Sequence, residues 1–438
     1  MIGRLFLILY SSFLINSMQN VWHPFTIIKD APEPLKVKSG KGAYLTLEDG
    51  REVLDCISSW WVNMHGHSHP DIAKAIYEQA KTLEHVIFAG FTHDPAEQLS
   101  ELITEELPKN LNKVFFSDNG STAVEVGMKI AYQYWKNIGQ ERKTFICFEG
   151  AYHGDTLGAM SAGERSIFTD VFKDWMFDVE VIPYPETWIG DEDRANKEDT
   201  VIEQLEGLLA KYPEKYAGIL MEPLVQGAGG MRMCSEEFLQ KVHWSNRQFD
   251  TLLLFDEVMT GFGRTGDYFA CKRAQVQPDI ICLSKGITGG FMPLSVTVSS
   301  DEIYESFNST DPIKTFWHGH SYTGNPLGCA AGIASWKLLK ENAPVFKGME
   351  AIHAKHLEKL ADHPRLEKFR VKGTIAAMDI INEEEGGYLN SVAKRIKEEC
   401  VDHGLLLRPL GNVLYLMPPY CVTEDELDMI YGKIGELV

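Results

Sequence analysis

A lysine and a carboxylate each follow a short apolar run of the chain. Lys285 comes two residues after the run 279–283 (DIICL), and Asp256 closes the run 252–255 (LLLF). Burial at the end of a strand lowers the pKa of a lysine and so provides a neutral, nucleophilic amine. Each residue also has an ordinary structural role open to it, because Lys285 could reach solvent and Asp256 could cap a following helix. As a pair they indicate chemistry on a bound electron-accepting group.

Two further segments carry groups suited to a flat, phosphorylated cofactor. Gly120 and Ser121 open the stretch 121–135, which has helical spacing. The free N–H groups of a helix start favour a phosphate, although Ser121 could simply be a helix cap. Tyr152 follows the run 144–148 (TFICF), where an aromatic ring can stack on a flat cofactor. Together with the lysine and the acid, these residues predict a site for an electron-accepting cofactor such as pyridoxal phosphate, which needs a Schiff-base lysine and an acid beside the ring nitrogen.

Two other motifs are weaker signals. The segment 261–266 matches G-x-G-x-x-G, but it follows DEVMT and runs into Asp267 without the strand–helix context of a dinucleotide site. The alternate histidines at 65–69 and 318–320 lack a complementary set of acids or thiols. We therefore expect shaped loops at these places and no metal site.

The elements that must position these residues alternate along the middle of the chain. Apolar runs predict strands at 114–117, 144–148, 179–182, 218–221, 252–255, 279–283 and 294–298. Helical spacing predicts helices at 121–135, 199–211 and 235–248. Strands that are apolar on both faces and alternate with helices predict an α/β fold with a mainly parallel sheet.

Both ends of the chain have a different pattern. Residues 34–55 predict a small antiparallel unit with a hairpin turn at Asp49-Gly50, and a second β-rich stretch covers about 370–381 and 405–416. We therefore predict a large domain at 71–335 and a smaller α+β domain built from 18–70 and 336–438. We interpret the apolar residues 1–17 as a non-functional N-terminal extension, with export and organelle targeting as alternatives.

Composition narrows the function classes. The chain has 438 residues with a formal net charge of −20, and so negative a surface repels nucleic acid. The eight cysteines form no C-x-x-C pair, which is typical of reduced thiols in a cytoplasmic protein. The apolar run near the N-terminus is shorter than the ~20 residues that span a membrane, so we expect no membrane partner.

Four segments carry a resemblance to the fold type I pyridoxal-phosphate aminotransferases of class III, the ω-aminotransferases. They are SDNGSTAVEVGMK, AYHGDT, FDEVMTGFGRTG and LSKGITGG. The resemblance implies that Lys285 binds the cofactor covalently, that Asp256 pairs with its ring nitrogen and that Tyr152 stacks on its ring. It further implies that Gly120 and Ser121 hold the phosphate. His320 and Ser321 (HGHSYTGNP) would complete the cofactor site, with Ser321 supplied by the second subunit of a homodimer.

A narrower resemblance is to the adenosylmethionine-8-amino-7-oxononanoate aminotransferases within that class. It rests on WHPF, SSWW, VQGAGGMRM and LYLMPPY, and it implies the conversion of 8-amino-7-oxononanoate to 7,8-diaminononanoate in biotin biosynthesis. The substrate residues that it implies are Phe25, Trp60, Trp61, Tyr152, Arg264, Lys285, Gly319 and Arg408. Arg408 would bind the substrate carboxylate, and a long apolar chain with one carboxylate is suited by aromatic walls and one arginine.

One residue departs from the narrower pattern. The family usually has tyrosine where this chain has Phe25, and relatives that use lysine as amino donor also carry phenylalanine there. We expect S-adenosylmethionine as the donor because Trp60 and Trp61 can pack a flat ring system, with lysine as the alternative. Three different functions stay open beside this one: an ω-aminotransferase for ornithine, 4-aminobutyrate or a diamine with 2-oxoglutarate, a nicotinamide oxidoreductase, and a non-catalytic regulator.

Overall fold

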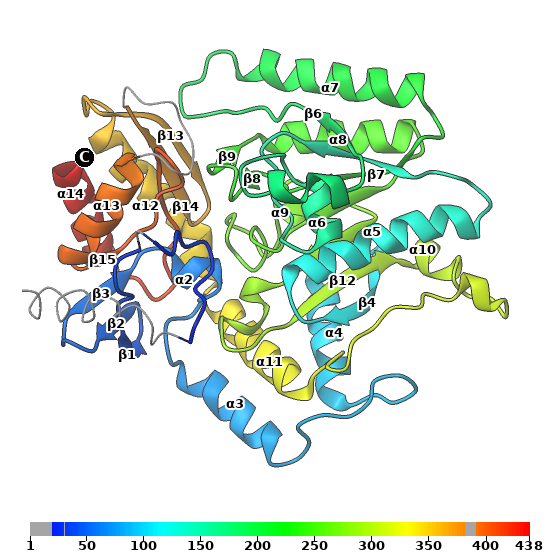
Figure 1. The fold of residues 1–438 in the computed structure, drawn as a ribbon, viewed down its shortest axis with the longest axis horizontal. Coiled ribbons are helices and arrows are strands. Elements are labelled where there is room, and N and C mark those ends of the chain that lie inside the picture. The colour runs from blue at the N-terminus through cyan, green and yellow to red at the C-terminus, as the bar shows by residue number, and fades with distance from the viewer. Residues whose placement is uncertain (1–19, 30, 382–390) are drawn as a thin grey trace, which may run out of the picture. The chain divides into compact units, whose positions relative to one another are not determined.

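The structure, a computed structural model, describes residues 20–29, 31–381 and 391–438 (Figure 1). The predicted extension at 1–17 lies outside the described residues. The chain divides into two compact units, 1–37 and 38–438. In the first unit, the described residues 20–29 and 31–36 form turns and irregular segments. The boundaries predicted at 70/71 and 335/336 stay predictions.

A seven-stranded sheet forms the centre of the second unit, with the order β4-β12-β11-β10-β7-β5-β6. Pairing is parallel between β11, β10, β7, β5 and β6, while β12 runs antiparallel to both of its neighbours. Its strands are β4 (Leu111–Ser117), β5 (Thr144–Phe148), β6 (Glu180–Ile182), β7 (Tyr216–Met221), β10 (Leu253–Asp256), β11 (Ile280–Leu283) and β12 (Ser295–Ser300). All seven predicted strands overlap a strand of this sheet, which confirms the prediction of a mainly parallel sheet.

Both faces of this sheet are buried. Leu254 and Leu220 belong to one apolar cluster, which includes the inner face of α5 (Gly120–Asn137), whereas Phe255 and Met221 belong to a second cluster on the other face. Alternate residues of a strand point to opposite faces, so strands that are apolar throughout require cover on both sides. The three predicted helices are confirmed as α5, α7 (Arg194–Lys211) and α8 (Glu236–Gln248).

One smaller sheet joins segments from both ends of the chain. It has the order β1-β2-β3-β15, in which β15 pairs in parallel with β3. Its strands are β1 (Val37–Lys41), β2 (Tyr44–Leu47), β3 (Glu52–Asp55) and β15 (Leu405–Leu406), and the predicted turn at Asp49-Gly50 joins β2 to β3. The other small sheets comprise β13 (Leu366–Lys372), β14 (Ile375–Ile380) and β16 (Val413–Leu416), and the pair β8 (Val225–Gln226) and β9 (Arg232–Met233).

The remaining helices surround these sheets (Figure 1). They are α2 (Ser58–Trp61), α3 (Pro70–Ala80), α4 (Asp94–Glu106), α6 (Leu157–Ala162), α9 (Ala270–Arg273), α10 (Asp301–Glu305), α11 (Pro326–Glu341), α12 (Ala343–Leu360), α13 (Ser391–Asp402) and α14 (Glu424–Leu437). The described residues also form the short 3₁₀ turns η1 (Asp170–Trp175), η2 (Lys285–Thr288) and η3 (Pro312–Lys314). Among the described residues, no helix is both long and apolar enough to cross a lipid bilayer.

Candidate active site

Lys285 and Asp256 follow neighbouring parallel strands. Asp256 ends β10 and pairs in register with Cys282 of β11, and Lys285 begins η2 just beyond β11. Lys285 has a φ of 41°, in the left-handed region that non-glycine residues rarely adopt. Burial lowers the pKa of Lys285, against the opposing charges of Asp256 and Glu222. The sheet therefore presents a carboxylate and a readily deprotonated amine at one edge.

Asp256 is held by two donors. Its Oδ2 lies 2.7 Å from Nδ1 of His153, and its Oδ1 accepts the backbone N–H of Val258 at 3.1 Å. Burial alone would lower the pKa of His153, but its hydrogen bond to Asp256 and the nearby negative charge raise it. Because His153 follows the predicted ring stacker, Tyr152, it connects the stacking loop to the carboxylate. The sequence predicted no role for His153, which lies in the segment AYHGDT.

A second buried carboxylate, Glu222, was missed. It follows the end of β7, accepts the backbone N–H of Tyr152 at 3.1 Å and accepts that of Gly227 at 2.9 Å. Burial raises its pKa to about 7, with His153 and both N–H groups acting in the opposite direction. The signal that identified Asp256, an acid at the end of an apolar strand, also applies to Glu222 in GILME.

The residues predicted to hold a phosphate lie at the start of α5, and their role stays a prediction. Asn119 caps the helix by accepting the N–H of Thr122 at 3.0 Å, so the N–H groups of Gly120 and Ser121 lie in the first turn, which has no intrahelical acceptors. A Cβ at Gly120 would lie 2.6 Å from Cγ1 of Val258, so only glycine lets α5 begin against the segment after Asp256. The Ser121 hydroxyl already bonds to Thr156, at 2.9 Å between the two oxygens.

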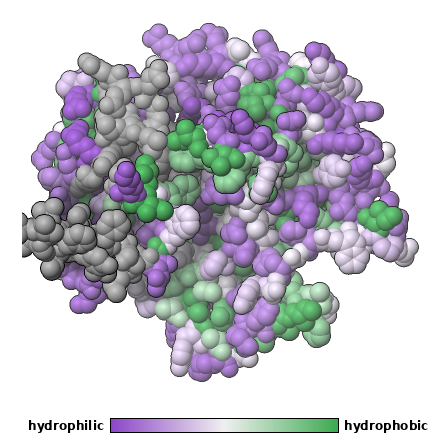
Figure 2. Space-filling model, viewed as in Figure 1, coloured by the Kyte–Doolittle hydropathy of each residue, from purple (hydrophilic) through white to green (hydrophobic). Residues whose placement is uncertain are grey.

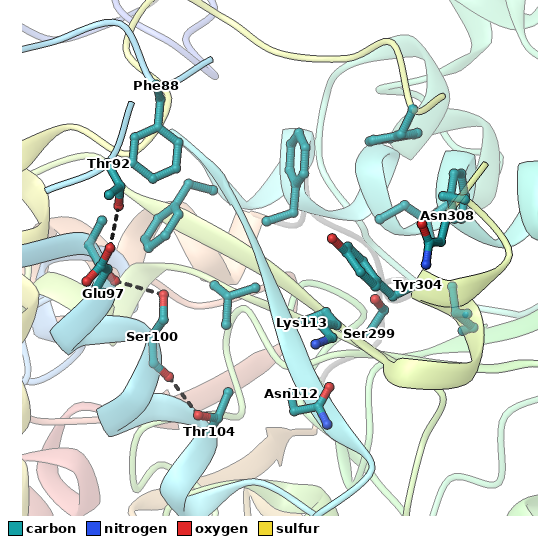
Figure 3. Close-up of a pocket in the computed structure, with 18 of the residues that line it drawn as sticks. Phe88, Thr92, Glu97, Ser100, Thr104, Asn112, Lys113, Ser299, Tyr304 and Asn308 are labelled. Atoms are coloured by element: carbon teal, nitrogen blue, oxygen red, sulfur yellow. Dashed lines mark hydrogen bonds between the residues drawn. The ribbon is translucent and has the colours of Figure 1, made fainter. Parts of the chain in front are cut away.

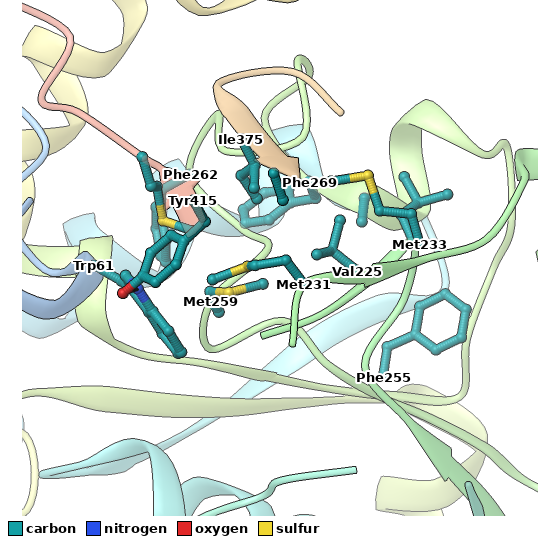
Figure 4. Packing of buried hydrophobic residues seen from close by; sticks show 14 of the residues in the cluster. Trp61, Val225, Met231, Met233, Phe255, Met259, Phe262, Phe269, Ile375 and Tyr415 are labelled. Carbon is teal, nitrogen blue, oxygen red and sulfur yellow. Dashed lines mark hydrogen bonds between the residues drawn. The ribbon is translucent and has the colours of Figure 1, made fainter. Parts of the chain in front are cut away.

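Trp61 forms a wall beside Lys285. Nζ of Lys285 lies 4.9 Å from the centre of the indole ring, and Nε1 of Trp61 donates to the Tyr415 hydroxyl at 3.0 Å. Figure 4 shows Trp61 beside Tyr415, with Met259 next to them in the buried cluster. Trp61 is therefore fixed in orientation, and one face of its ring is turned toward the lysine.

Trp60 and Arg408 form a second contact at the site. The Arg408 guanidinium lies 4.6 Å from the centre of the Trp60 ring, which is a cation–π distance. Trp60 is partly exposed, in contrast to the buried Trp61. The structure thus brings together the predicted aromatic wall and the predicted carboxylate-binding arginine, although they are far apart in the sequence.

Arg264 lies next to Trp61 but is completely buried. Its guanidinium donates to the backbone carbonyls of Pro418, Trp61 and Asn63 at 2.9, 3.4 and 3.5 Å. These contacts fix the backbone that carries the tryptophan wall. A direct role for Arg264 toward substrate stays a prediction.

The remaining predicted residues lie in other segments. Gly319, His320 and Ser321 belong to a loop before α11, in which the His320 N–H donates to Thr323 Oγ1 at 3.1 Å and Ser321 is exposed. Phe25 belongs to the unit 1–37 and has a φ of 49°. The roles assigned to these four residues stay predictions.

The described residues fit pyridoxal phosphate. No carboxylate among them lies within ion-pair distance of Nζ of Lys285, so its amine is open to a carbonyl carbon. Asp256 supplies a buried acid, and α5 supplies N–H groups for a phosphate. The chain would hold the cofactor through Lys285, Asp256, Tyr152, Gly120 and Ser121.

A large cavity lies elsewhere in the second unit. It has a volume of about 860 Å³ and lies between α4, β4 and α10, where Thr92 and Glu97 lie on one side and Tyr304 and Asn308 on the other (Figure 3). None of the predicted site residues lines it. This cavity is therefore separate from the candidate active site.

Comparison with known proteins decides the family. The family model described as "Aminotransferase class-III" matches residues 28–438. This chain belongs to the class-III aminotransferases. A relative in Synechococcus elongatus, described as an adenosylmethionine-8-amino-7-oxononanoate aminotransferase, is 57% identical over 422 residues, covering 96% of this chain and 99% of the relative.

Solved structures agree with this assignment. The chain is similar to the adenosylmethionine-8-amino-7-oxononanoate aminotransferase of Methanocaldococcus jannaschii, with a TM-score of 0.89, 32% identity and coverage of 97% and 98% of the two chains. It is also similar to an amine transaminase from an uncultivated Pseudomonas species, solved with pyridoxal phosphate bound, with a TM-score of 0.89, 29% identity and coverage of 96% and 98%. The predicted family and the predicted fold type I α/β architecture are confirmed.

Proposed function

We propose that this class-III aminotransferase uses pyridoxal phosphate to transfer an amino group to 8-amino-7-oxononanoate, which gives 7,8-diaminononanoate for biotin biosynthesis, with S-adenosylmethionine as donor. The 57% identity to the Synechococcus relative, over nearly the whole of both chains, carries the proposal. The contact of Arg408 with Trp60 supports it, because the acceptor has one carboxylate at the end of an apolar chain.

Individual residues of the chain have separate roles in the proposed reaction. When bound, the cofactor would supply an electron sink for the electron pair that remains when the donor carbon loses its proton. The Lys285 amine holds the cofactor and then moves that proton, and Asp256 keeps the ring nitrogen protonated. Trp61 excludes water from the face beside Lys285, and Arg408 orients the acceptor through its carboxylate.

The test separates the two halves of the reaction. S-adenosylmethionine or free lysine is mixed with the holoenzyme, and the visible absorbance of the cofactor bound to Lys285 is followed. We expect S-adenosylmethionine to bleach the band and 8-amino-7-oxononanoate to restore it. If free lysine bleaches the band and S-adenosylmethionine does not, the proposed donor is wrong. If ornithine, 4-aminobutyrate or a diamine works with 2-oxoglutarate, while 8-amino-7-oxononanoate does not restore the band, the proposed acceptor is wrong.

We further propose a homodimer in which Ser321 of one subunit completes the cofactor site of the other. Large apolar side chains are exposed near the ends of the loop that holds Ser321, including Trp317 and Tyr322. A hydrophobic area at the lower right of Figure 2 lies over the loop that follows α3, where Ile87 and Phe91 are exposed. Contiguous exposed apolar surface is typical of an interface.

The homodimer is tested by light scattering of the purified protein. We expect twice the chain mass of 49.4 kDa. A monomer that retains full activity would contradict the proposal.

We also propose that the enzyme is cytoplasmic, because all eight cysteines are free in the structure and seven are buried. Fractionation of the source cells tests this location.

A further inference from the structure

The segment that carries both tryptophans has an unusual backbone. Ser58, Ser59, Trp60 and Trp61 have φ values of 51°, 46°, 69° and 74°. Residues other than glycine rarely adopt this left-handed region even singly, and four in succession form one turn of opposite hand to an α-helix. Such a turn persists only where its surroundings impose it, and strained backbone of this kind is typical of functional sites.

The carboxylate of Asp55 is the main polar anchor of this turn. Asp55 is completely buried at the end of β3. Its Oδ1 accepts the N–H groups of Ile57 at 3.2 Å and Ser59 at 2.9 Å, and its Oδ2 accepts the Ser59 hydroxyl at 2.7 Å. Asp55 thus satisfies N–H groups at the start of the turn, as a capping residue does for an ordinary helix.

A histidine and an asparagine fix the carboxylate in turn. Nε2 of His67 lies 2.9 Å from Oδ2 of Asp55, and its Nδ1 lies 2.8 Å from the Asn63 side-chain nitrogen. An amide nitrogen can only donate, so Nδ1 accepts and the proton of a neutral His67 lies on Nε2, facing Asp55. Every contact of the carboxylate is then a donor to it, which gives it one orientation.

The strand register connects this turn to Arg408. Asp55 of β3 pairs in parallel with Leu406 of β15, so the turn and Arg408 both follow the same end of two neighbouring strands. This places the Trp60 ring 4.6 Å from the Arg408 guanidinium. The orientation of the arginine therefore depends on the backbone of the turn.

We propose that Asp55 is a positioning residue for acceptor specificity: by holding the left-handed turn, it sets the Trp60–Arg408 pair that receives the carboxylate of the acceptor. This inference rests on the proposed function, in which Arg408 binds that carboxylate. Asp55 itself touches neither substrate nor cofactor in the proposed reaction, because it lies beneath the turn. It acts on the affinity for the acceptor through the geometry of two other residues.

The test compares Asp55→Asn with a matched control, Glu198→Gln. Glu198 is also buried and also accepts a serine N–H and hydroxyl, those of Ser235 at 2.8 and 2.7 Å, at the start of α8. We expect Asp55→Asn to raise KM for 8-amino-7-oxononanoate about tenfold, the effect of one misplaced charge-assisted hydrogen bond, with little change in kcat. We expect Glu198→Gln to lower the melting temperature without this change in KM.

A second substitution tests whether the backbone of the turn is the cause. Glycine adopts the left-handed region freely, so adding Ser59→Gly to Asp55→Asn should recover much of the lost acceptor affinity. The near-UV circular dichroism of the tryptophans should change in Asp55→Asn, return toward the wild-type spectrum in the double variant and stay unchanged in Glu198→Gln. If Asp55→Asn does not fold, Ser59→Ala removes one donor to the carboxylate and should give a smaller shift in the same direction.

The outcomes distinguish the inference from the proposed function. Equal KM shifts in Asp55→Asn and Glu198→Gln, or a KM shift without a change in the tryptophan spectrum, would overturn the inference and leave the function standing. A wild-type enzyme that does not use 8-amino-7-oxononanoate would overturn the function and the claim on acceptor specificity. The spectra would then still decide whether Asp55 holds the turn.

Discussion

Replacing Arg408 with methionine should weaken the acceptor half of the reaction and spare the donor half. The structure places the guanidinium over the Trp60 ring, 4.6 Å from its centre, where a carboxylate could accept from its N–H groups. Hydrogen bonds to charged groups contribute about 1.5–3 kcal/mol, which corresponds to about a 10- to 150-fold loss in kcat/KM for 8-amino-7-oxononanoate. Methionine keeps an apolar stem beside Trp60, so the ring should stay packed.

The assay measures each half of the reaction separately. Bleaching of the cofactor by the donor should proceed at the wild-type rate, while its recovery with 8-amino-7-oxononanoate should require more acceptor. Arg395→Met is the matched control, because Arg395 is exposed and paired with Glu399 at 3.3 Å in α13. An unchanged acceptor half-reaction, or an equal loss in both halves, would refute the assignment of the carboxylate to Arg408.

Three more predictions follow from the contacts of the site. Lys285→Ala should lower turnover about a thousandfold or more and remove the visible absorbance of lysine-bound cofactor, and retained activity would exclude its role. Glu222 has a pKa raised from 4.5 to about 7, so its contribution to stability is present at low pH and lost as the pH rises through that range. The melting temperature of Glu222→Gln should therefore rise relative to that of the wild type as the pH rises. Melting temperatures that change with pH in parallel in the two proteins would contradict this. Trp61→Phe leaves the Tyr415 hydroxyl without its indole donor and should lower the free energy of unfolding by about 1–3 kcal/mol, measured in urea; an unchanged free energy would argue against this contact.

The sequence was most informative where local pattern and chemistry coincide. The strands before Asp256 and Lys285 are apolar on both faces, which predicts parallel strands, and parallel strands bring their carboxyl ends to one edge. Glu222 also follows the end of an apolar strand, so the same argument could have identified it. His153 and Asp55 could not be identified in this way, because their roles depend on partners that come from other strands and loops.

The left-handed turn shows a different limit of prediction. The letters SSWW contain no glycine, and nothing in their type indicates positive φ at four successive residues. The conformation follows from three features. Asp55 accepts the N–H groups of the turn, and the buried Ser58 hydroxyl donates to the Met417 carbonyl at 2.7 Å. Strand β3, which precedes the turn, also pairs with β15, about 350 residues away. Long-range contacts therefore override the local preference.

The two arginines assigned to the pocket show why residue type cannot define a role. Arg264 and Arg408 are both cations in an acidic chain, and an anionic acceptor could bind either. Arg264 directs its guanidinium at three backbone carbonyls and has a pKa lowered by burial, so a carboxylate would have to displace those carbonyls. Arg408 is less deeply buried than Arg264 and contacts the partly exposed Trp60 ring at a cation–π distance. Binding of an anion to a protein with a net charge of −20 thus depends on the local position of each cation, and the difference in burial makes Arg408 the better candidate of the two.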